Sequence, residues 1–151
     1  MTRILPITPA DRDEWAELWN GYLEFYETEL DEATTASTFD RLATAGSGVH
    51  GAIARDRDGR AVGIVHWLTH PSTWAIGDYC YLEDLFVLPA VRGGGVGAAR
   101  IEHVRAWAAE HGAAKVYWLT AENNRVARAV YNRVATDTGF VHYEIDLTPR
   151  R

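Results

Sequence analysis

Apolar side chains recur along this chain with two spacings, every second residue and every third or fourth residue. The first spacing predicts strands, and the second predicts helices with one buried face. A turn-rich segment at residues 56–60 separates two strand patterns and indicates an antiparallel hairpin. In chain order, we expect strands at 3–8, 49–55, 61–68, 79–87, 114–119 and 140–147, and helices at about 9–26, 35–44, 95–110 and 124–136.

The order of these elements predicts a single domain over residues 1–151, of the α/β (α+β) class. With 151 residues, 47% of them hydrophobic, the chain can build a real core. The strand at 79–87, the helix at 95–110 and the strand at 114–119 form one β-α-β unit, so these two strands should run parallel. The central sheet is therefore predicted to be mixed, mostly antiparallel and flanked by helices.

Four glycines lie within the eight residues that follow Pro89, between a predicted strand and a predicted helix. Glycine lets the backbone come close to a ligand, and the N–H groups at a helix start favour an anion such as phosphate. A nucleotide P-loop would need Lys-Ser or Lys-Thr after the last glycine, where two alanines stand. The dinucleotide spacing is met by Gly93, Gly95 and Ala98, although that turn normally opens a β-α-β series early in a domain.

The charge of the chain is unevenly distributed. The net charge is −6, with six Lys/Arg and fifteen Asp/Glu in residues 1–84 (−9), but nine and six in residues 85–151 (+3). A basic half that holds the glycine turn suits a polyanionic cofactor, and an acidic half suits a cationic acceptor. The negative total argues against nucleic acid as a partner. Solvated surface helices are the alternative explanation of each cluster.

Cysteine and histidine usage excludes further classes of protein. The single Cys80 cannot form an internal disulfide, and the six histidines lack the spacing of metal ligands, so we expect no metal. No apolar run reaches transmembrane length and no signal peptide is visible. We therefore expect a cytoplasmic protein without a membrane partner.

A second motif lies near the end of the chain. The pattern N-x-x-A-x-x-x-Y runs from Asn124 to Tyr131 on a predicted helix. Together with [RQ]-x-x-G-x-[GA] at residues 92–97, after a strand ending Leu-Phe-Val-Leu-Pro, it resembles the GNAT N-acetyltransferases over most of the chain. The chain departs from the family pattern by roughly one extra helical turn between Tyr131 and Gly139.

The resemblance implies how acetyl-coenzyme A is held where the two parallel strands splay apart. Main-chain groups of Leu85, Phe86 and Val87 would bond the pantetheine arm, which Asn124 would also contact. The Tyr131 hydroxyl would face the sulfur. The pyrophosphate would lie against Arg92, Gly93, Gly94, Gly95, Val96, Gly97 and Ala98. Members of this family are often dimeric, so the resemblance also implies a homodimer.

Residues 81–87 resemble the central strand of the diamine and polyamine (spermidine/spermine-type) acetyltransferases and related broad-specificity enzymes within this family. In those enzymes the glutamate that matches Glu83 lies near the acceptor amine. Glu83 and Asp84 are neighbours in a strand and should point to opposite faces, so we assign Glu83 to the amine. A structural salt bridge is the alternative for either acid. The expected acceptor-binding residues are Tyr22, Glu24, Tyr26 and Asp84.

These residues predict direct acetyl transfer to a primary amine of a small, cationic, polyamine-like acceptor. Glu83 would take a proton from the ammonium through water, and Tyr131 would protonate the leaving thiolate. Cys80 offers a covalent route but has no evident base. Two alternatives stay open: an amino-acid, peptide or protein acceptor, and a non-catalytic acyl-CoA sensor. A sensor would need neither Glu83 nor Tyr131.

Overall fold

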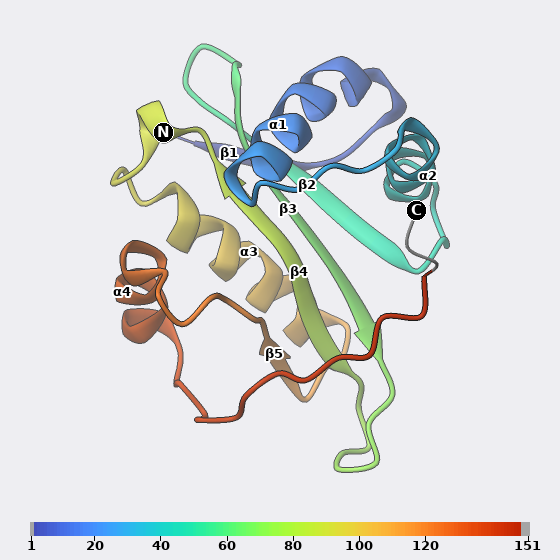
Figure 1. The fold of residues 1–151 in the computed structure, drawn as a ribbon, viewed down its shortest axis with the longest axis vertical. Helices are drawn as coiled ribbons and strands as arrows, with labels where there is room; N and C mark the ends of the chain where they lie inside the picture. Colours follow the sequence, from blue (N-terminus) through green and yellow to red (C-terminus); the bar gives the residue numbers. More distant parts are fainter. Residues whose placement is uncertain (1, 149–151) are drawn as a thin grey trace. The chain divides into compact units, whose positions relative to one another are not determined.

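A computed structural model describes residues 2–148 (Figure 1). The chain forms two compact units, one ending at Trp118 and one beginning at Leu119. The first unit holds β1 (Arg3–Pro6), η1 (Pro9–Asp11), α1 (Arg12–Phe25), α2 (Glu32–Leu42), β2 (Val49–Arg55), β3 (Ala61–His70), β4 (Tyr79–Val87), η2 (Pro89–Val91), α3 (Val96–Glu110) and β5 (Lys115–Tyr117). The second unit holds α4 (Arg125–Val134).

The sheet has the order β1-β2-β3-β4-β5, with the first four strands antiparallel in turn. The last pair is parallel, with Tyr79 opposite Lys115 and Tyr81 opposite Tyr117. The predicted β-α-β unit and the mixed, mostly antiparallel sheet are therefore confirmed. Because β5 is short, its ladder stops at Tyr81. From Leu82 onward, the described residues give β4 a strand partner on one side only.

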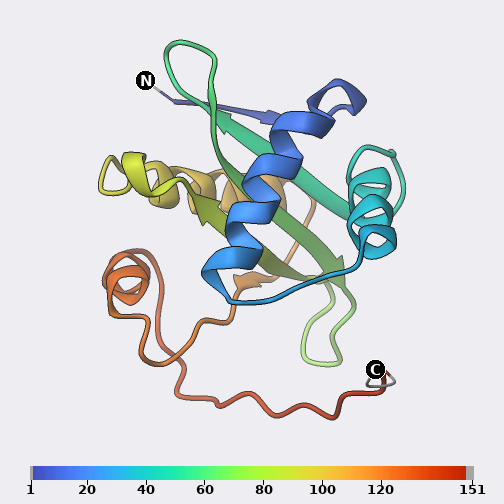
Figure 2. The ribbon, with the colours of Figure 1, turned by 45° about the horizontal axis from the view of Figure 1, so that its top comes forward.

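Helices cover both faces of the sheet in the first unit. The helices α1 and α2 lie on one face and α3 on the other (Figure 2). Aromatic residues of α1 supply the core of its face, where Trp15 and Trp19 stack at 5.4 Å between ring centroids. This core is formed by Ile7, Trp15, Leu18, Trp19, Phe39, Leu42, Ile53, Ala61, Ile64 and Phe86.

Side-chain caps stand at the start of η1 and of α2. Thr8 and Asp11 close the 3-10 turn η1, in which the Thr8 N–H donates to Asp11 Oδ2 at 2.8 Å. This short turn leads into α1. The helix α2 begins earlier than predicted because Asp31 accepts a hydrogen bond from the Thr34 N–H at 2.7 Å.

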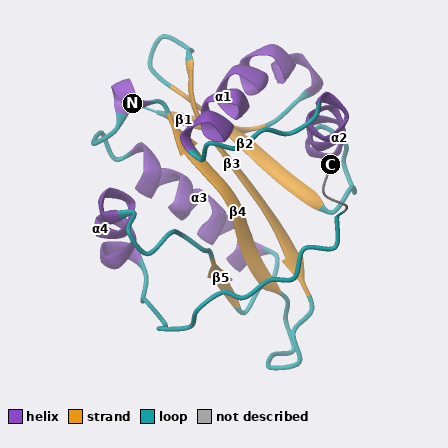
Figure 3. Ribbon diagram, in the orientation of Figure 1, coloured by secondary structure: helices purple, strands orange, loops and turns teal. Residues whose placement is uncertain are grey.

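The prediction of a last strand at residues 140–147 was wrong. In the second unit, the described residues after α4 form no ladder and run as a loop to residue 148 (Figure 3). Val141, Tyr143, Ile145 and Leu147 alternate with polar residues as a strand would, but alternation alone provides no partner for the backbone N–H and C=O groups. Within residues 2–148, no helix is long and apolar enough to cross a membrane.

Candidate active site

The glycine turn between η2 and α3 has the properties of a phosphate site. Gly93 and Gly95 have φ angles of 90° and 79°, which favour glycine, and Gly95 caps the helix. The first N–H groups of α3 have no partner within the helix, and its first turn carries no acidic residue. A Cβ built at Gly93, Gly95 or Gly97 would meet no protein atom within 4 Å. The protein therefore leaves free space around these three glycines.

Two arginines bind the carbonyl groups at the end of β4. The Arg100 side chain is 1% exposed and donates to the main-chain oxygens of Phe86 and of Ile64, the latter at 2.6 Å. Arg92 donates from Nε to the Val87 oxygen at 3.3 Å, and its guanidinium lies 5.1 Å from the Phe25 ring centroid. One acceptor position on each of these two β4 carbonyls is thus already used by the protein.

A β-bulge interrupts β4 at Glu83. Asp84 pairs with His66 of β3 and Leu82 pairs with Trp67, so Glu83 has no opposite residue. The extra residue breaks the alternation of faces, because Leu82 and Asp84 now lie on opposite faces. Glu83 directly follows Leu82 and therefore points away from the Leu82 face, to the face that Asp84 occupies. The prediction that Glu83 and Asp84 point to opposite faces was therefore wrong.

Asp84 lies in a network of buried hydrogen bonds that the sequence did not reveal. His66 Nδ1 is 2.9 Å from Asp84 Oδ2, and Trp15 Nε1 donates to His66 Nε2 at 3.0 Å. His66 is 3% exposed and the Asp84 side chain 14% exposed. Burial raises the pKa of Tyr22, and the nearby Asp84 charge raises it further. The tyrosine is therefore neutral, and it lies close to the carboxylate.

Glu83 has a different environment from Asp84. Its side chain is exposed, yet enough protein surrounds the carboxyl group for desolvation to raise its pKa, and the neighbouring Asp84 charge raises it further. Burial and the two acids also raise the pKa of Tyr81 to about 12. Glu83 is thus the more accessible of the two adjacent acids.

Aromatic residues and a histidine lie beside this acidic pair, where the β4–β5 ladder ends. Tyr81 and Tyr117 stack with ring centroids 4.9 Å apart. The Tyr117 hydroxyl is 2.7 Å from His70 Nε2, while His70 Nδ1 is 2.8 Å from the Pro71 oxygen. Because a carbonyl oxygen only accepts, Nδ1 carries the proton and Tyr117 donates to Nε2. Tyr81, Tyr117 and His70 are therefore joined to one another at the end of this ladder.

The remaining sequence candidates in the first unit divide into two groups. Tyr22 and Tyr26 lie together, with ring centroids 5.0 Å apart, and the Asp84 charge helps to raise the pKa of Tyr26. Glu24 is exposed on α1 and no described hydrogen bond or ion pair joins its side chain to this network. Cys80 is fully buried, and burial raises its pKa to about 11, which makes it a poor nucleophile.

The second unit carries the other two predicted residues on one helix. Asn124 caps α4, because its side-chain oxygen accepts from the Ala127 N–H at 3.4 Å. Tyr131 lies about two turns further on, so both residues occupy the same side of α4. The cap gives Asn124 a structural role in addition to the predicted contact with the cofactor.

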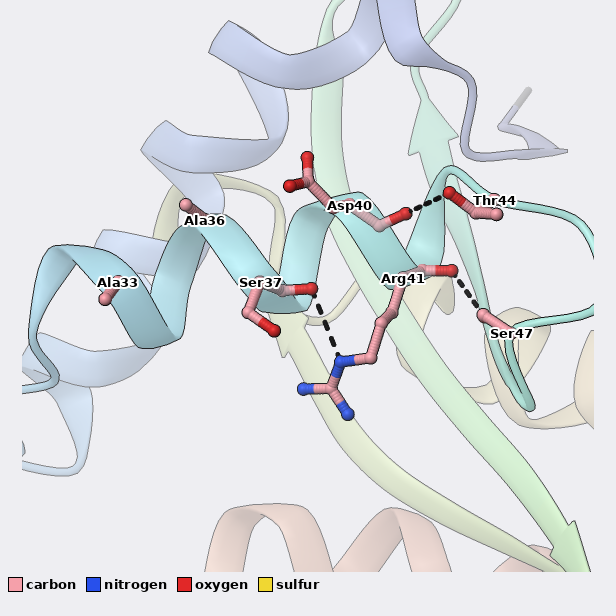
Figure 4. A pocket seen from close by; sticks show the side chains of 7 residues that line it. All are labelled: Ala33, Ala36, Ser37, Asp40, Arg41, Thr44 and Ser47. Carbon is pink, nitrogen blue, oxygen red and sulfur yellow. Dashed lines mark hydrogen bonds between the residues drawn. The ribbon is translucent and has the colours of Figure 1, made fainter.

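A shallow hollow on the outer side of α2 does not resemble a catalytic site (Figure 4). Its polar groups bond within the same segment: Arg41 Nε donates to the Ser37 oxygen at 3.3 Å, and the Ser47 hydroxyl to the Arg41 oxygen at 2.6 Å. Among residues 2–148, no cluster of three or more His, Cys, Asp or Glu side chains is arranged to hold a metal ion.

His66, Trp15 and Arg100 are the site residues that sequence reasoning missed. His66 and Trp15 occupy positions in an apolar strand and an aromatic stripe, where their hydrogen bonds have no periodic signature. Only the β3–β4 register places His66 opposite Asp84. Arg100 could have been identified from the sequence, because a charged residue at an otherwise apolar position of a helix indicates a buried polar contact.

Comparison with known proteins agrees with this geometry. Residues 13–135 match the acetyltransferase (GNAT) family. The chain is 35% identical over 139 residues to the D-amino-acid N-acetyltransferase of Saccharomyces cerevisiae, covering 91% of this chain and 86% of that protein.

Solved structures show the same fold. The ribosomal-protein-alanine N-acetyltransferase from Brucella melitensis biovar Abortus 2308 superposes with a TM-score of 0.80 at 20% identity, covering 97% of this chain and 100% of that one. AAC(6')-Iy in complex with the bisubstrate analogue CoA-S-monomethyl-acetylneamine gives 0.76 at 19% identity, covering 100% and 98%. The chain therefore belongs to the GNAT family of acetyltransferases, which use acetyl-CoA.

Proposed function

We propose that this chain transfers the acetyl group of acetyl-CoA directly to the primary amine of a small, cationic molecule. The observation that carries this proposal is the position of Glu83 and Asp84. Both carboxylates lie on one face of β4, and the same strand leads into the open glycine turn. Negative charge attracts an ammonium ion, and the tyrosines beside it favour a cation further.

The residues that would hold the cofactor lie at the end of β4 and after it. The N–H groups from Gly93 to Ala98 would bind the pyrophosphate, and the main chain at Leu85, Phe86 and Val87 the pantetheine arm, with Asn124 beside it. Arg92 and Arg100 already occupy the carbonyls of Val87 and Phe86. We therefore assign the larger share of the pantetheine bonds to N–H groups and to the Leu85 carbonyl.

Bound acetyl-CoA supplies a thioester that a neutral amine can attack. Glu83 prepares the amine by taking its proton through water, which suits a carboxylate whose pKa is raised by desolvation and by the Asp84 charge. Tyr131 donates its hydroxyl proton to the sulfur as the thiolate leaves. Cys80 takes no part, because its thiol is buried and its pKa is about 11.

Two classes of acceptor are each favoured by one observation. The acidic pair and the charge of −9 in residues 1–84 favour a polyamine-like molecule with several ammonium groups. The 35% identity to a D-amino-acid N-acetyltransferase favours an amino acid instead. A basic amino acid would satisfy both observations, because it is an amino acid whose side chain carries a second positive charge.

Thiol release from acetyl-CoA with purified protein tests this function. We would compare spermidine, the D and L forms of lysine and alanine, an aminoglycoside and a basic peptide. The proposal expects saturable turnover of multiply charged small amines, with a KM that rises with ionic strength. If alanine were turned over as efficiently as lysine, the proposal of a cationic acceptor would be wrong, and the acceptors would be amino acids in general. Acetyl-CoA binding without turnover of any amine would contradict the enzyme itself.

The family resemblance also predicts a homodimer, and the absence of a membrane-spanning or signal sequence leads us to expect a cytoplasmic location. We propose that residues 140–147, which form no strand in one chain, pair with a second copy, because their alternating pattern suits an added strand. Light scattering of the protein in solution measures the predicted dimer, and a Tyr143→Pro variant should shift it towards monomer. A monomer at all concentrations would contradict this proposal.

A further inference from the structure

We propose that His66 is a positioning residue, which together with Trp15 fixes the Asp84 carboxylate as the anchor for the acceptor ammonium. The proposal rests on the proposed function, because it names which carboxylate binds the amine. It divides the two acids into a rigid anchor, Asp84, and an accessible base, Glu83.

The hydrogen bonds determine how His66 is protonated. Trp15 Nε1 can only donate, so His66 Nε2, at 3.0 Å, must accept. The neutral ring then carries its proton on Nδ1 and donates to Asp84 Oδ2 at 2.9 Å. A ring with the proton on Nε2 would place two donors against each other at Trp15 and leave Asp84 without its partner. The tryptophan thus selects the tautomer that holds the carboxylate.

The surrounding residues keep this arrangement rigid. Trp15 is 1% exposed and His66 3% exposed, and the Trp19 ring centroid lies 5.5 Å from the imidazole centroid. Gly51 lies opposite His66 in β2, and a Cβ there would come within 3.2 Å of the imidazole Cδ2. The absence of a side chain at residue 51 therefore leaves the space that the ring occupies.

The position of Asp84 explains why such a support is useful. His66 donates to this carboxylate, Tyr22 lies near it, and its 14% exposed side chain can still contact a small ligand. The hydrogen bond from a neutral ring does not neutralise its charge. A carboxylate that is already held by a donor loses less side-chain entropy when it binds an ammonium ion. Glu83 has no such described support, which suits a group that must exchange protons with water.

A pair of variants separates positioning from simple structural support. His66→Leu removes the donor to Asp84, whereas His66→Asn keeps an N–H close to the place of Nδ1. We expect His66→Leu to raise the acceptor KM about tenfold, because it removes a hydrogen bond to a charged group. The KM for acetyl-CoA should stay the same, kcat should change little, and His66→Asn should restore most of the acceptor KM. His111→Leu, at an exposed histidine at the end of α3, is the matched control.

A spectroscopic measurement tests the network without any turnover. Long-range ¹H–¹⁵N correlation at pH 8 should show the His66 proton on Nδ1, and Trp15→Phe should produce a mixture of tautomers. A proton on Nε2 in the wild-type protein would overturn the proposal. So would an unchanged acceptor KM in folded His66→Leu, or equal losses for acceptor and acetyl-CoA that asparagine does not restore. Wild-type protein that acetylates no amine would instead overturn the proposed function, and the role of Asp84 as an anchor with it.

Discussion

Among single residues, Glu83 and Asp84 differ in what surrounds their carboxyl groups. Asp84 accepts a hydrogen bond from His66, whereas Glu83 is exposed and its pKa is raised by desolvation and by the charge of its neighbour. Two like charges this close in sequence cannot both be ionised without cost. Glu83 therefore takes up a proton more readily than an ordinary glutamate does.

Replacing Asp84 by asparagine should therefore move the acid limb of activity. The Asp84 charge raises the pKa of Glu83, so its removal lowers that pKa. A base must be deprotonated to act, and activity falls as the pH drops through its pKa. In Asp84→Asn, the fall in kcat/KM on acidification should thus begin at a lower pH than in the wild type. The measurement is the pH profile with one amine, with Asp58→Asn on an exposed turn as the control. An unmoved acid limb would remove Glu83 as the base.

Tyr131, in the second unit, is another single residue whose proposed role can be tested. If its hydroxyl protonates the leaving thiolate, Tyr131→Phe should lower kcat by about 10²-fold, since a thiolate leaves tolerably well without help. The affinity for acetyl-CoA should not change, because the aromatic ring remains. Steady-state kinetics combined with an acetyl-CoA binding titration measures both effects, and Tyr143→Phe is the matched control. Wild-type turnover in Tyr131→Phe would exclude this role.

At the scale of elements, the glycine turn could be predicted from sequence and the acidic pair could not. Pro89, the glycines and the start of α3 are local in sequence, and backbone geometry at Gly95 needs only local information. The direction of Glu83 depends on a bulge that arises in pairing with β3. The prediction of a strand at residues 140–147 failed for a related reason. A strand requires a partner strand, which an alternating pattern of apolar and polar residues does not provide. The order of the elements and the parallel pair were confirmed because they follow from periodicity and chain connectivity.

Gly97 allows a test of whether a glycine in this turn is required by the ligand or by the fold. It lies in the first turn of α3 and its φ angle is not positive, so the backbone does not require glycine there. A Cβ at this position would meet no protein atom within 4 Å. Gly97→Ala should therefore stabilise the protein by about 0.5–1 kcal/mol through helix propensity. It should also weaken acetyl-CoA binding by about tenfold or more, because the methyl group enters the space for the pyrophosphate.

Chemical denaturation and an acetyl-CoA titration measure the two effects of Gly97→Ala separately. Ser37→Ala on α2 is a control for helix propensity alone, and it should leave acetyl-CoA binding unchanged. A Gly97→Ala protein that bound acetyl-CoA as the wild type does would mean that this glycine does not adjoin the cofactor.

For the molecule as a whole, charge is separated along the chain and histidines are concentrated on the α3 face of the sheet. The acidic first part and the basic remainder suit two ligands of opposite charge. On the α3 side, His50 lies 4.6 Å from Trp107 and His103 lies 5.8 Å from Trp67, as distances between ring centroids. These histidines take no part in the proposed chemistry, but they link stability to pH.

The free energy of unfolding should fall as the pH is lowered from about 7 to about 5. Burial lowers the pKa of His103, and burial with the charge of His111 lowers that of His50, so the folded chain takes up protons less readily than the unfolded chain below the usual histidine pKa of about 6.5. Stability contributed by these neutral rings is complete above that pH and is lost below it. Glu14, whose pKa Arg55 lowers from 4.5, adds its own loss only at still lower pH. Denaturant titrations at several pH values should show a decline that the double variant His50→Gln/His103→Gln reduces, whereas a decline of equal size in both proteins would place its origin in other groups.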